Sequence, residues 1–382
     1  MSTDPPRLHR LPCTDVAASV EWLAALIRRD ADLFHKPLDV AVVADAQAHG
    51  VCGIVKQALC ARGLWPLVPN DARNALDVEL RRAALTDGYF RRQTIRAVAA
   101  LQNAGVPALT FKGEALACTH YSPSHSRSRC DSDLLVAKRD VPMASRVLEA
   151  LGYGRVNMVA REAVHTQQVF TERSGAMRHV IDLHWDVSHR PFFAGIFTFD
   201  ELMRDAVEID GLAPELRAPD PVRALLLACL HRVTHHENST RLIWLYDIHL
   251  LADGLQDRQW AQVHRLGGEK SICDVCATGM ELAAEFFGCS ARTSNHVAAL
   301  RLLARERQET SRAYLTARRG DLNRIVMDAR HAGSLPKAIR VLAGHAFPDT
   351  EYMRRTFGAR GPVSLAGSYV YRAARGFRRL VM

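Results

Sequence analysis

Lysine is scarce in this chain of 382 residues, which carries 50 basic residues in all. The lysines are Lys36, Lys56, Lys112, Lys138, Lys270 and Lys337. All other basic residues are arginines, and the formal net charge is +9. A positive charge of this size favours anionic partners such as nucleotides, nucleic acid or a membrane surface, but it does not choose among them.

Long apolar runs and a regular cysteine pattern are also missing. The longest apolar stretch, from Ala224 to Leu230, is far shorter than the roughly 20 residues of a transmembrane helix. Nine cysteines are scattered from Cys13 to Cys289, which is unlike a disulfide framework. The first residues lack the charged-then-apolar layout of a signal peptide. We therefore expect a cytoplasmic protein with no membrane span.

The periodicity of apolar residues divides the chain into three parts. Apolar residues three and four positions apart predict helices over the first hundred residues and again from Pro219 onward. Between them, Val106–Phe111, Asp131–Ala137 and Arg178–Val187 are short runs typical of strands. We expect an α+β fold with a mixed-sheet core and helices at residues 85–215, a helical N-terminal region at 1–84 and a helical C-terminal region at 216–382.

Three aspartates in the predicted core carry the strongest chemical signal. Asp131 and Asp133 are two positions apart on a strand, so both carboxylates point to the same face. Asp182 and His184 share the polar face of a second strand. If the two strands are neighbours, three carboxylates converge and require a cation, and hard oxygen ligands suit Mg²⁺ or Mn²⁺. His184 would then stand beside the metal or a bound nucleotide.

Lys112 and Gly113 lie where a predicted strand gives way to a helix. A glycine there lets a phosphate approach the backbone N–H groups, and the helix dipole favours the anion. Lys112 adds a positive charge, and its scarcity as a residue type makes the position notable. Arg127 and Arg129 precede the aspartate pair and can reach outer phosphates through bidentate contacts.

These motifs, taken in order, resemble a bacterial family of uncharacterised nucleotidyltransferases that belongs to the DNA polymerase beta superfamily. They are Leu109-Thr-Phe-Lys-Gly-Glu-Ala-Leu116, Arg127-Ser-Arg-Cys-Asp-Ser-Asp-Leu-Leu-Val136, Leu151-Gly-Tyr153, Ile181-Asp-Leu-His-Trp185, Leu225-Leu-Leu-Ala-Cys-Leu-His-Arg-Val-Thr-His235 and Arg241-Leu-Ile-Trp-Leu-Tyr-Asp247. The resemblance covers most of the chain from about Leu80. It implies a polymerase-beta-like core that transfers a nucleoside monophosphate from a nucleoside triphosphate to an acceptor and releases pyrophosphate.

The resemblance also implies roles for individual residues. Asp131 and Asp133 would bind two metal ions, and Asp182 would hold the catalytic one and help to deprotonate the acceptor hydroxyl. Nucleotide binding would fall to Lys112, Gly113 and Arg127, with Arg129 and His184 as further candidates. This chain departs from the superfamily in having Lys-Gly for Gly-Ser, Ser132 for an apolar residue and Glu114 beside the expected phosphate site.

The motifs do not identify the acceptor, and they allow two other hypotheses about the function. The acceptor could be a small molecule, a peptide or a protein side chain. A tRNA acceptor, as in related toxin nucleotidyltransferases, has only the basic C-terminus in its favour. That terminus carries Arg354, Arg355, Arg360, Arg372, Arg375, Arg378 and Arg379. A catalytically silent nucleotide-binding scaffold is the third reading, which Ser132 and Glu114 favour and the three aspartates oppose.

Overall fold

The computed structural model of the chain describes residues 16–28, 38–156, 166–175, 177–209, 216–236, 238–316, 322–347, 350–359 and 361–381. Cys13, Lys36 and Arg360 lie outside these residues. One mixed sheet among many helices confirms the expected α+β class. In the part of the chain described, no helix combines the length and apolar character that a bilayer span requires.

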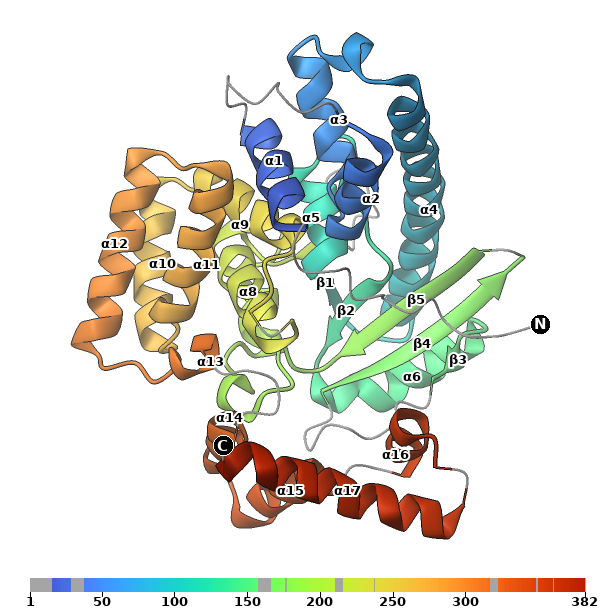
Figure 1. The fold of residues 1–382 in the computed structure, drawn as a ribbon, viewed down its shortest axis with the longest axis vertical. Coiled ribbons are helices and arrows are strands. Elements are labelled where there is room, and N and C mark those ends of the chain that lie inside the picture. The colour runs from blue at the N-terminus through green and yellow to red at the C-terminus, as the bar shows by residue number, and fades with distance from the viewer. Residues whose placement is uncertain are drawn as a thin grey trace.

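Seven strands form the sheet in the order β3-β4-β5-β2-β1-β7-β6 (Figure 1). From one edge to the other they are β3 (Gly154–Arg155), β4 (Gln167–Ser174), β5 (Met177–His184), β2 (Ser132–Val136), β1 (Ala108–Thr110), β7 (Arg217–Ala218) and β6 (Val207–Glu208). Strand β2 is parallel to β5 and antiparallel to β1. The three strands predicted from the sequence are therefore neighbours in the middle of the sheet.

Side chains alternate strictly between the two faces of these central strands. Leu134, Val136, Ile181 and Leu183 point to one face, where they form a core with helices α4 and α6. These helices span Asn70–Asn103 and Val141–Ala150. Polar residues of β2 and β5 at the intervening positions point to the other face. Helix α4 continues through residue 84 without a break, so the predicted N-terminal boundary falls inside it.

Helices from both ends of the chain pack together beside the sheet (Figure 1). The N-terminal ones are α1 (Val16–Arg28), α2 (Val40–His49) and α3 (Cys52–Ala61), and α5 (Lys112–His120) follows β1. The later ones are α7 (Phe199–Arg204), α8 (Pro221–Thr234), α9 (Leu242–Gly254), α10 (Asp257–Glu269), α11 (Cys273–Phe287) and α12 (Ala291–Glu306). Helix α9 packs against α8, α11 and α5, which joins the helical region to the sheet.

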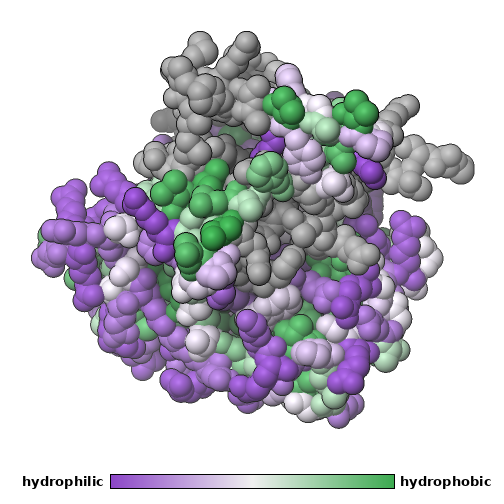
Figure 2. All heavy atoms as spheres, turned by 90° about the horizontal axis from the view of Figure 1, so that it is seen from below, coloured by the Kyte–Doolittle hydropathy of each residue, from purple (hydrophilic) through white to green (hydrophobic). Residues whose placement is uncertain are grey.

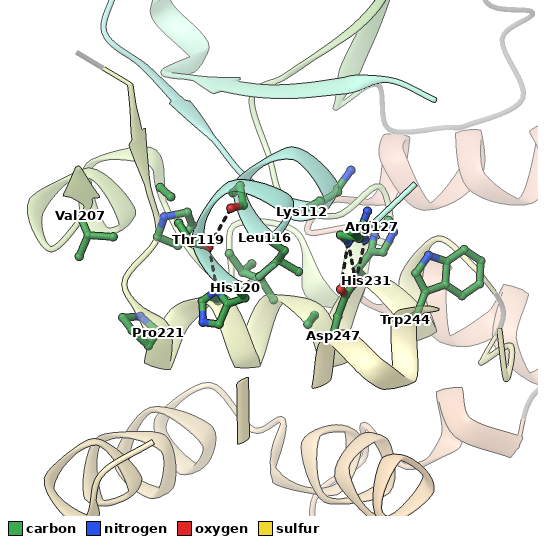
Figure 3. Close-up of a pocket in the computed structure, with 16 residues that line it drawn as sticks. Lys112, Leu116, Thr119, His120, Arg127, Val207, Pro221, His231, Trp244 and Asp247 are labelled. Atoms are coloured by element: carbon green, nitrogen blue, oxygen red, sulfur yellow. Dashed lines mark hydrogen bonds and ion pairs between the residues drawn. The ribbon is translucent and has the colours of Figure 1, made fainter. Parts of the chain in front are cut away.

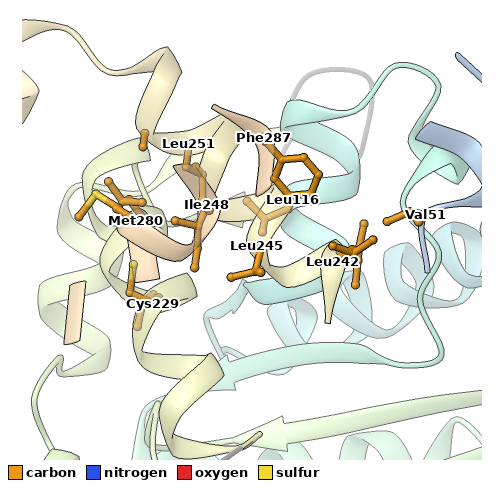
Figure 4. Close-up of a cluster of buried hydrophobic side chains, with 14 of the residues drawn as sticks. Val51, Leu116, Cys229, Leu242, Leu245, Ile248, Leu251, Met280 and Phe287 are labelled. Atoms are coloured by element: carbon orange, nitrogen blue, oxygen red, sulfur yellow. The ribbon is translucent and has the colours of Figure 1, made fainter. Parts of the chain in front are cut away.

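A continuous apolar core holds these helices together (Figure 4). Leu245 and Ile248 of α9 are fully buried among Leu116, Cys229 and Met280, which come from three other helices. Burying one such aliphatic side chain stabilises the fold by about 1.5–3 kcal/mol. The core therefore helps to fix the position of α5 relative to α8 and α9.

The starts of α8 and α9 show why the helices begin where they do. Asp220 caps α8 by accepting hydrogen bonds from the backbone N–H groups of Val222 and Arg223, and Pro221 occupies the first helical position. Helix α9 begins at Leu242. Asn238, four residues earlier, has a left-handed backbone with φ 62°, which differs from the conformation inside a right-handed helix.

The last helices form a separate layer at the lower end of the molecule in Figure 1. They are α14 (Leu322–Arg330), α15 (Leu335–Ala346), α16 (Thr350–Phe357) and α17 (Pro362–Val381), and they follow the short helix α13 (Ala313–Thr316) in the chain. Asp328 of α14 attaches this layer to the rest of the protein, because it accepts hydrogen bonds from Tyr314 at 2.8 Å and Arg190 at 3.3 Å.

Candidate active site

Two neighbouring strands bring Asp133, Asp182 and His184 together. Asp133 of β2 lies directly opposite Asp182 of β5 in the parallel register, so both carboxylates point to the same face. Ligand atoms of Asp133, Asp182 and His184 all lie within 4.8 Å of one another. The convergence that the sequence predicts for Asp133 and Asp182 is therefore present, and His184 is part of it.

Asp131 lies one residue before β2 and lines the same cleft, but it is not part of this close group. It still interacts with the others through charge. Burial and the charge of Asp133 raise the pKa of Asp131 to about 6. Burial, Asp133 and Asp131 raise the pKa of Asp182 to about 7. Asp131 and Asp182 therefore require a further cation if they are to be ionised together with Asp133.

Lys112 supplies one positive charge at this point. Its Nζ lies 2.7 Å from Oδ1 of Asp133 and 3.2 Å from Nε2 of His184, and that Nε2 lies 2.8 Å from the same oxygen. Burial would raise the pKa of Asp133, but Lys112 and His184 outweigh it and the pKa falls to about 2. Lys112 reaches this position from a left-handed backbone with φ 54°, a strained conformation of the kind found at functional sites.

The donor set fits a divalent metal ion. Asp133 and Asp182 offer hard carboxylate oxygens, and Mg²⁺ or Mn²⁺ prefers such ligands with water and phosphate completing the shell. Burial and the charge of Lys112 lower the pKa of His184 to about 4, so the imidazole is neutral at physiological pH. A neutral imidazole can either ligate a metal or hold a carboxylate ligand in place.

Metal affinity is expected to rise with pH because protonated carboxyls must lose their protons to bind the ion. With pKa values of about 7 for Asp182 and about 6 for Asp131, Mg²⁺ should bind about ten- to twentyfold more tightly at about pH 8 than at about pH 6. Calorimetry in buffers of different ionisation enthalpy measures both the affinity and the released protons. Asp182→Asn should remove most of the pH dependence, and an affinity that is constant across this range would contradict the assignment.

Arg127 does not extend freely toward a phosphate, as the sequence suggests. Its Nε and Nη2 donate to the carboxylate of Asp247 at 2.9 and 2.6 Å, and Tyr121 donates to the same carboxylate at 2.6 Å. A Cβ on Gly113 would lie 2.6 Å from Nη1 of Arg127, so the glycine admits the guanidinium to the start of α5. Asp247 thus joins α9 to the loop that leads into β2.

Arg129 also has carboxylate partners in the protein interior. Its guanidinium pairs with Asp87 of α4 and with Glu114 of α5, at 3.5 Å for the latter. Glu114 is fully buried and accepts a hydrogen bond from Thr94 at 2.9 Å, on the side of α5 that faces α4. The side chain of Glu114 is therefore turned away from the cleft and into the protein interior. In that position its charge does not oppose the binding of an anion in the cleft.

Ser132 belongs to the same interior network. Its hydroxyl lies 2.9 Å from that of Thr94 and 3.0 Å from Nε2 of His179, whose Nδ1 lies 2.7 Å from the Tyr153 hydroxyl. Burial lowers the pKa of His179 to about 3, with smaller contributions from nearby arginines, so this imidazole is neutral. The hydroxyl of Ser132 thus provides a buried hydrogen-bond partner for Thr94 and His179.

Ser132→Ala is expected to lower the free energy of unfolding by about 1–3 kcal/mol, because Thr94 and His179 lose a buried partner. Urea unfolding followed by circular dichroism measures this difference. Ser294→Ala on the exposed surface of α12 is the matched control and should change stability by less than about 0.5 kcal/mol. Equal effects of the two substitutions would contradict the role assigned to the network.

The carboxylates open into a cleft of about 600 Å³ that more cationic than acidic side chains line. Its cationic residues are Arg82, Lys112, Arg127, Arg129, Arg178 and Arg241. Sequence analysis did not assign Arg178 or Arg241 to the site, although Arg241 begins one of the motifs given above. Arg178 lies on β5 and Arg241 precedes α9, and the folding of both segments around the cleft brings them together. His231, His235 and His236 line another part of the wall, and Nε2 of His231 lies 2.9 Å from Nε2 of His236.

A second, mainly apolar pocket of about 280 Å³ adjoins this cleft (Figure 3). It runs between α5 and α8 from Lys112 and Trp244 toward Val207 of β6, with Leu116 in its wall. The two hollows share four lining residues, namely Lys112, Arg127, His231 and Trp244. A molecule bound at the carboxylates can therefore extend an uncharged group into the apolar pocket.

Comparison with known proteins places this site in a protein family. The model of a family described as uncharacterised nucleotidyltransferase matches residues 40–288. The matched span runs from the first residue of α2 to one residue beyond α11 and includes every cleft residue named above. A search of curated proteins finds no match.

Proposed function

This chain belongs to the uncharacterised nucleotidyltransferase family, and on that premise we propose that it transfers a nucleoside monophosphate from a nucleoside triphosphate to an acceptor. The carrying observation is the group formed by Asp133, Asp182 and His184, with Lys112 at the start of a helix beside it. Carboxylates that need a cation, next to a basic cleft of about 600 Å³, fit a substrate that is a metal-bound polyphosphate.

Asp131, Asp133 and Asp182 are proposed to hold the metal ions, with His184 supporting Asp133. Mg²⁺ or Mn²⁺ bound there would neutralise charge on the reacting phosphate and on the leaving pyrophosphate. When the ion is bound, Lys112 is free to exchange Asp133 for a phosphate oxygen, since a flexible ammonium can move between two anions a short distance apart. The fold class that goes with this proposal is the polymerase-beta type.

The proposed reaction is a displacement at the α-phosphorus of the nucleotide. An oxygen of the acceptor hydroxyl forms the new bond to phosphorus, and the bond between the α-phosphorus and the bridging oxygen breaks, so pyrophosphate leaves. The hydroxyl proton passes to the carboxylate of Asp182.

Nucleotide binding is proposed to involve residues at the start of α5 and their supports. Lys112 and the backbone N–H of Gly113 face the phosphates, where the helix dipole adds to their attraction. Arg127 contributes positive charge from its pair with Asp247, and Arg129 lines the cleft while it supports α5 through Glu114. His184 completes the predicted nucleotide-binding set from its place beside Asp133.

We place the nucleotidyltransferase core at residues 85–215, between helical regions 1–84 and 216–382. The proposal includes a bacterial source and a cytoplasmic location, where nucleoside triphosphates are supplied. The test is incubation of the purified protein with Mg²⁺, each α-labelled nucleoside triphosphate and fractionated cell extract. Label should pass to one fraction of small molecules, peptides or proteins. Transfer to RNA would identify a tRNA-type acceptor, and no transfer of any label would favour a silent nucleotide-binding scaffold.

The apolar pocket is proposed to hold the uncharged part of a substrate, because the triphosphate requires the basic cleft. Ala228→Phe places an aromatic ring in this pocket and should lower kcat/KM about tenfold or more while Mg²⁺ binding stays unchanged. The substrate, nucleotide or acceptor, whose KM rises in Ala228→Phe is the one that occupies the apolar pocket. Ala298→Phe on the exposed face of α12 is the control, and equal kinetics for the two variants would leave the pocket without a substrate.

A further inference from the structure

The positive charge of the chain is concentrated in its last part. Residues 311–382 contain 14 lysines and arginines and four acidic residues, a formal charge of +10. The preceding 310 residues contain 36 basic and 37 acidic residues, a formal charge of −1. The family match ends at residue 288, so this basic part lies outside the region that carries the proposed reaction. The charge therefore needs an explanation of its own.

The same region exposes large apolar side chains at helical spacing. On α15, Leu335, Ile339 and Leu342 are four and three positions apart and 75%, 57% and 46% exposed. On α17, Val363 and Val370 are seven positions apart and 87% and 70% exposed. Side chains at these spacings lie on one side of a helix. Each of the two helices thus presents an apolar stripe to the outside of the described structure.

The helices that carry these stripes lie at the lower end of the molecule in Figure 1, the end from which Figure 2 is viewed. Hydrophobic side chains gather there in groups, with strongly hydrophilic surface beside them. The helices form the lower layer of Figure 1, and Asp328 fastens that layer to Tyr314 and Arg190. The stripes are therefore presented by helices attached to a folded protein. Of the 16 large apolar side chains exposed in the described residues, eight lie between Val326 and Tyr371.

Helices that carry both cationic and exposed aliphatic side chains favour a partner that is anionic and also has an apolar region. We propose that α15 and α17 dock this protein onto the surface of an anionic lipid membrane. Leucine, isoleucine and valine gain from insertion at the boundary between headgroups and acyl chains, and the excess of basic residues in this part of the chain attracts anionic headgroups. A nucleic acid backbone would use the charge but would leave these aliphatic side chains in water. A bilayer surface uses both features.

Vesicle binding by the full chain tests this proposal. The protein should sediment with phosphatidylcholine vesicles that contain about 30% phosphatidylglycerol, bind less at high salt and bind about tenfold or more weakly to pure phosphatidylcholine. Replacing Leu335, Ile339 and Val363 together by serine should weaken binding to the anionic vesicles about tenfold or more. These side chains are exposed, so the fold should be unaffected, which circular dichroism verifies. Val78→Ser with Leu85→Ser on α4 is the matched control and should bind as the unchanged protein does.

Any of the following three outcomes would overturn the proposal that this protein docks onto a membrane. Failure to bind anionic vesicles excludes the membrane. Binding of single- or double-stranded RNA that the triple serine variant retains in full would assign the charge to nucleic acid. A dimer in analytical ultracentrifugation that the triple variant dissociates would assign the stripes to a second copy of this chain. Nucleotide transfer to a dissolved acceptor should be equal in all these variants, so a failure here is distinct from failure of the proposed activity.

Discussion

Asp133→Asn is expected to lower nucleotidyl transfer by about 10³-fold or more, which corresponds to a loss of about 4 kcal/mol of transition-state stabilisation. The amide would keep the shape of the side chain but lose the charge that a metal ion and Lys112 both require. Asp133 sits at the centre of the site, since Lys112 and His184 contact the same carboxylate oxygen at 2.7 and 2.8 Å. Initial rates with saturating Mg²⁺ and labelled nucleotide measure the effect.

Two further substitutions make this result specific. Asp182→Asn should lower transfer by a similar factor, because it removes both a metal ligand and the proposed base. Asp257→Asn on the surface of α10, where the side chain is 80% exposed, should leave the rate unchanged. Near-native circular dichroism of all three variants separates loss of chemistry from loss of folding. Transfer by Asp133→Asn within tenfold of the unchanged protein would show that these carboxylates are not the reacting centre.

Asp247→Ala is expected to lower the free energy of unfolding by about 3–5 kcal/mol, the largest stability effect that we predict. The substitution leaves Arg127 as an unpaired charge and takes the hydrogen-bond acceptor from Tyr121, both in a buried environment. It also breaks the link between α9 and the loop that positions Asp131. Urea unfolding should show the loss directly, and nucleotide binding should weaken with it.

The double variant Arg127→Met/Asp247→Leu tests the origin of this effect. Removing both charges should restore most of the lost stability, because the cost of the single variant comes from an uncompensated buried charge. Glu269→Ala breaks the exposed Arg265–Glu269 pair on α10 and should change stability by no more than about 0.5 kcal/mol. If Asp247→Ala lowers the free energy of unfolding as little as Glu269→Ala does, water solvates the Arg127 guanidinium in the variant. The Arg127–Asp247 pair would then not stabilise the site.

The central strands and the facing of Asp133 and Asp182 could be predicted because each depends on a local pattern. Alternation of polar and apolar residues with a period of two identifies both strands and assigns each side chain to a face. The sequence left open whether β2 and β5 are neighbours. The parallel register that places Asp133 opposite Asp182 supplies that missing contact. The start of α5 at Lys112 agrees with the predicted passage from strand to helix.

The partners of Arg127, Arg129, Glu114 and Ser132 could not be predicted in this way. Arg127 and Asp247 are 120 positions apart in the chain, and nothing near either residue indicates the other. Glu114 and Ser132 look unsuited to a phosphate site because the sequence does not say which side of α5 and β2 they occupy. The helix α4 behind the sheet supplies Thr94 and Asp87, which give both residues and Arg129 buried partners.

Composition and periodicity thus identify which residue types form the centre of the site, namely two strand carboxylates, a lone lysine–glycine turn and a polar strand face. The folded arrangement was needed to establish which charges face the cleft and which are neutralised in the interior. The cause is that periodicity is a property of neighbouring residues, whereas the pairing of a buried charge depends on whatever distant segment folds against it. The net charge of +9 is a second example. Composition gives its sign, but only the fold shows that the helices of the basic last part of the chain also expose apolar side chains.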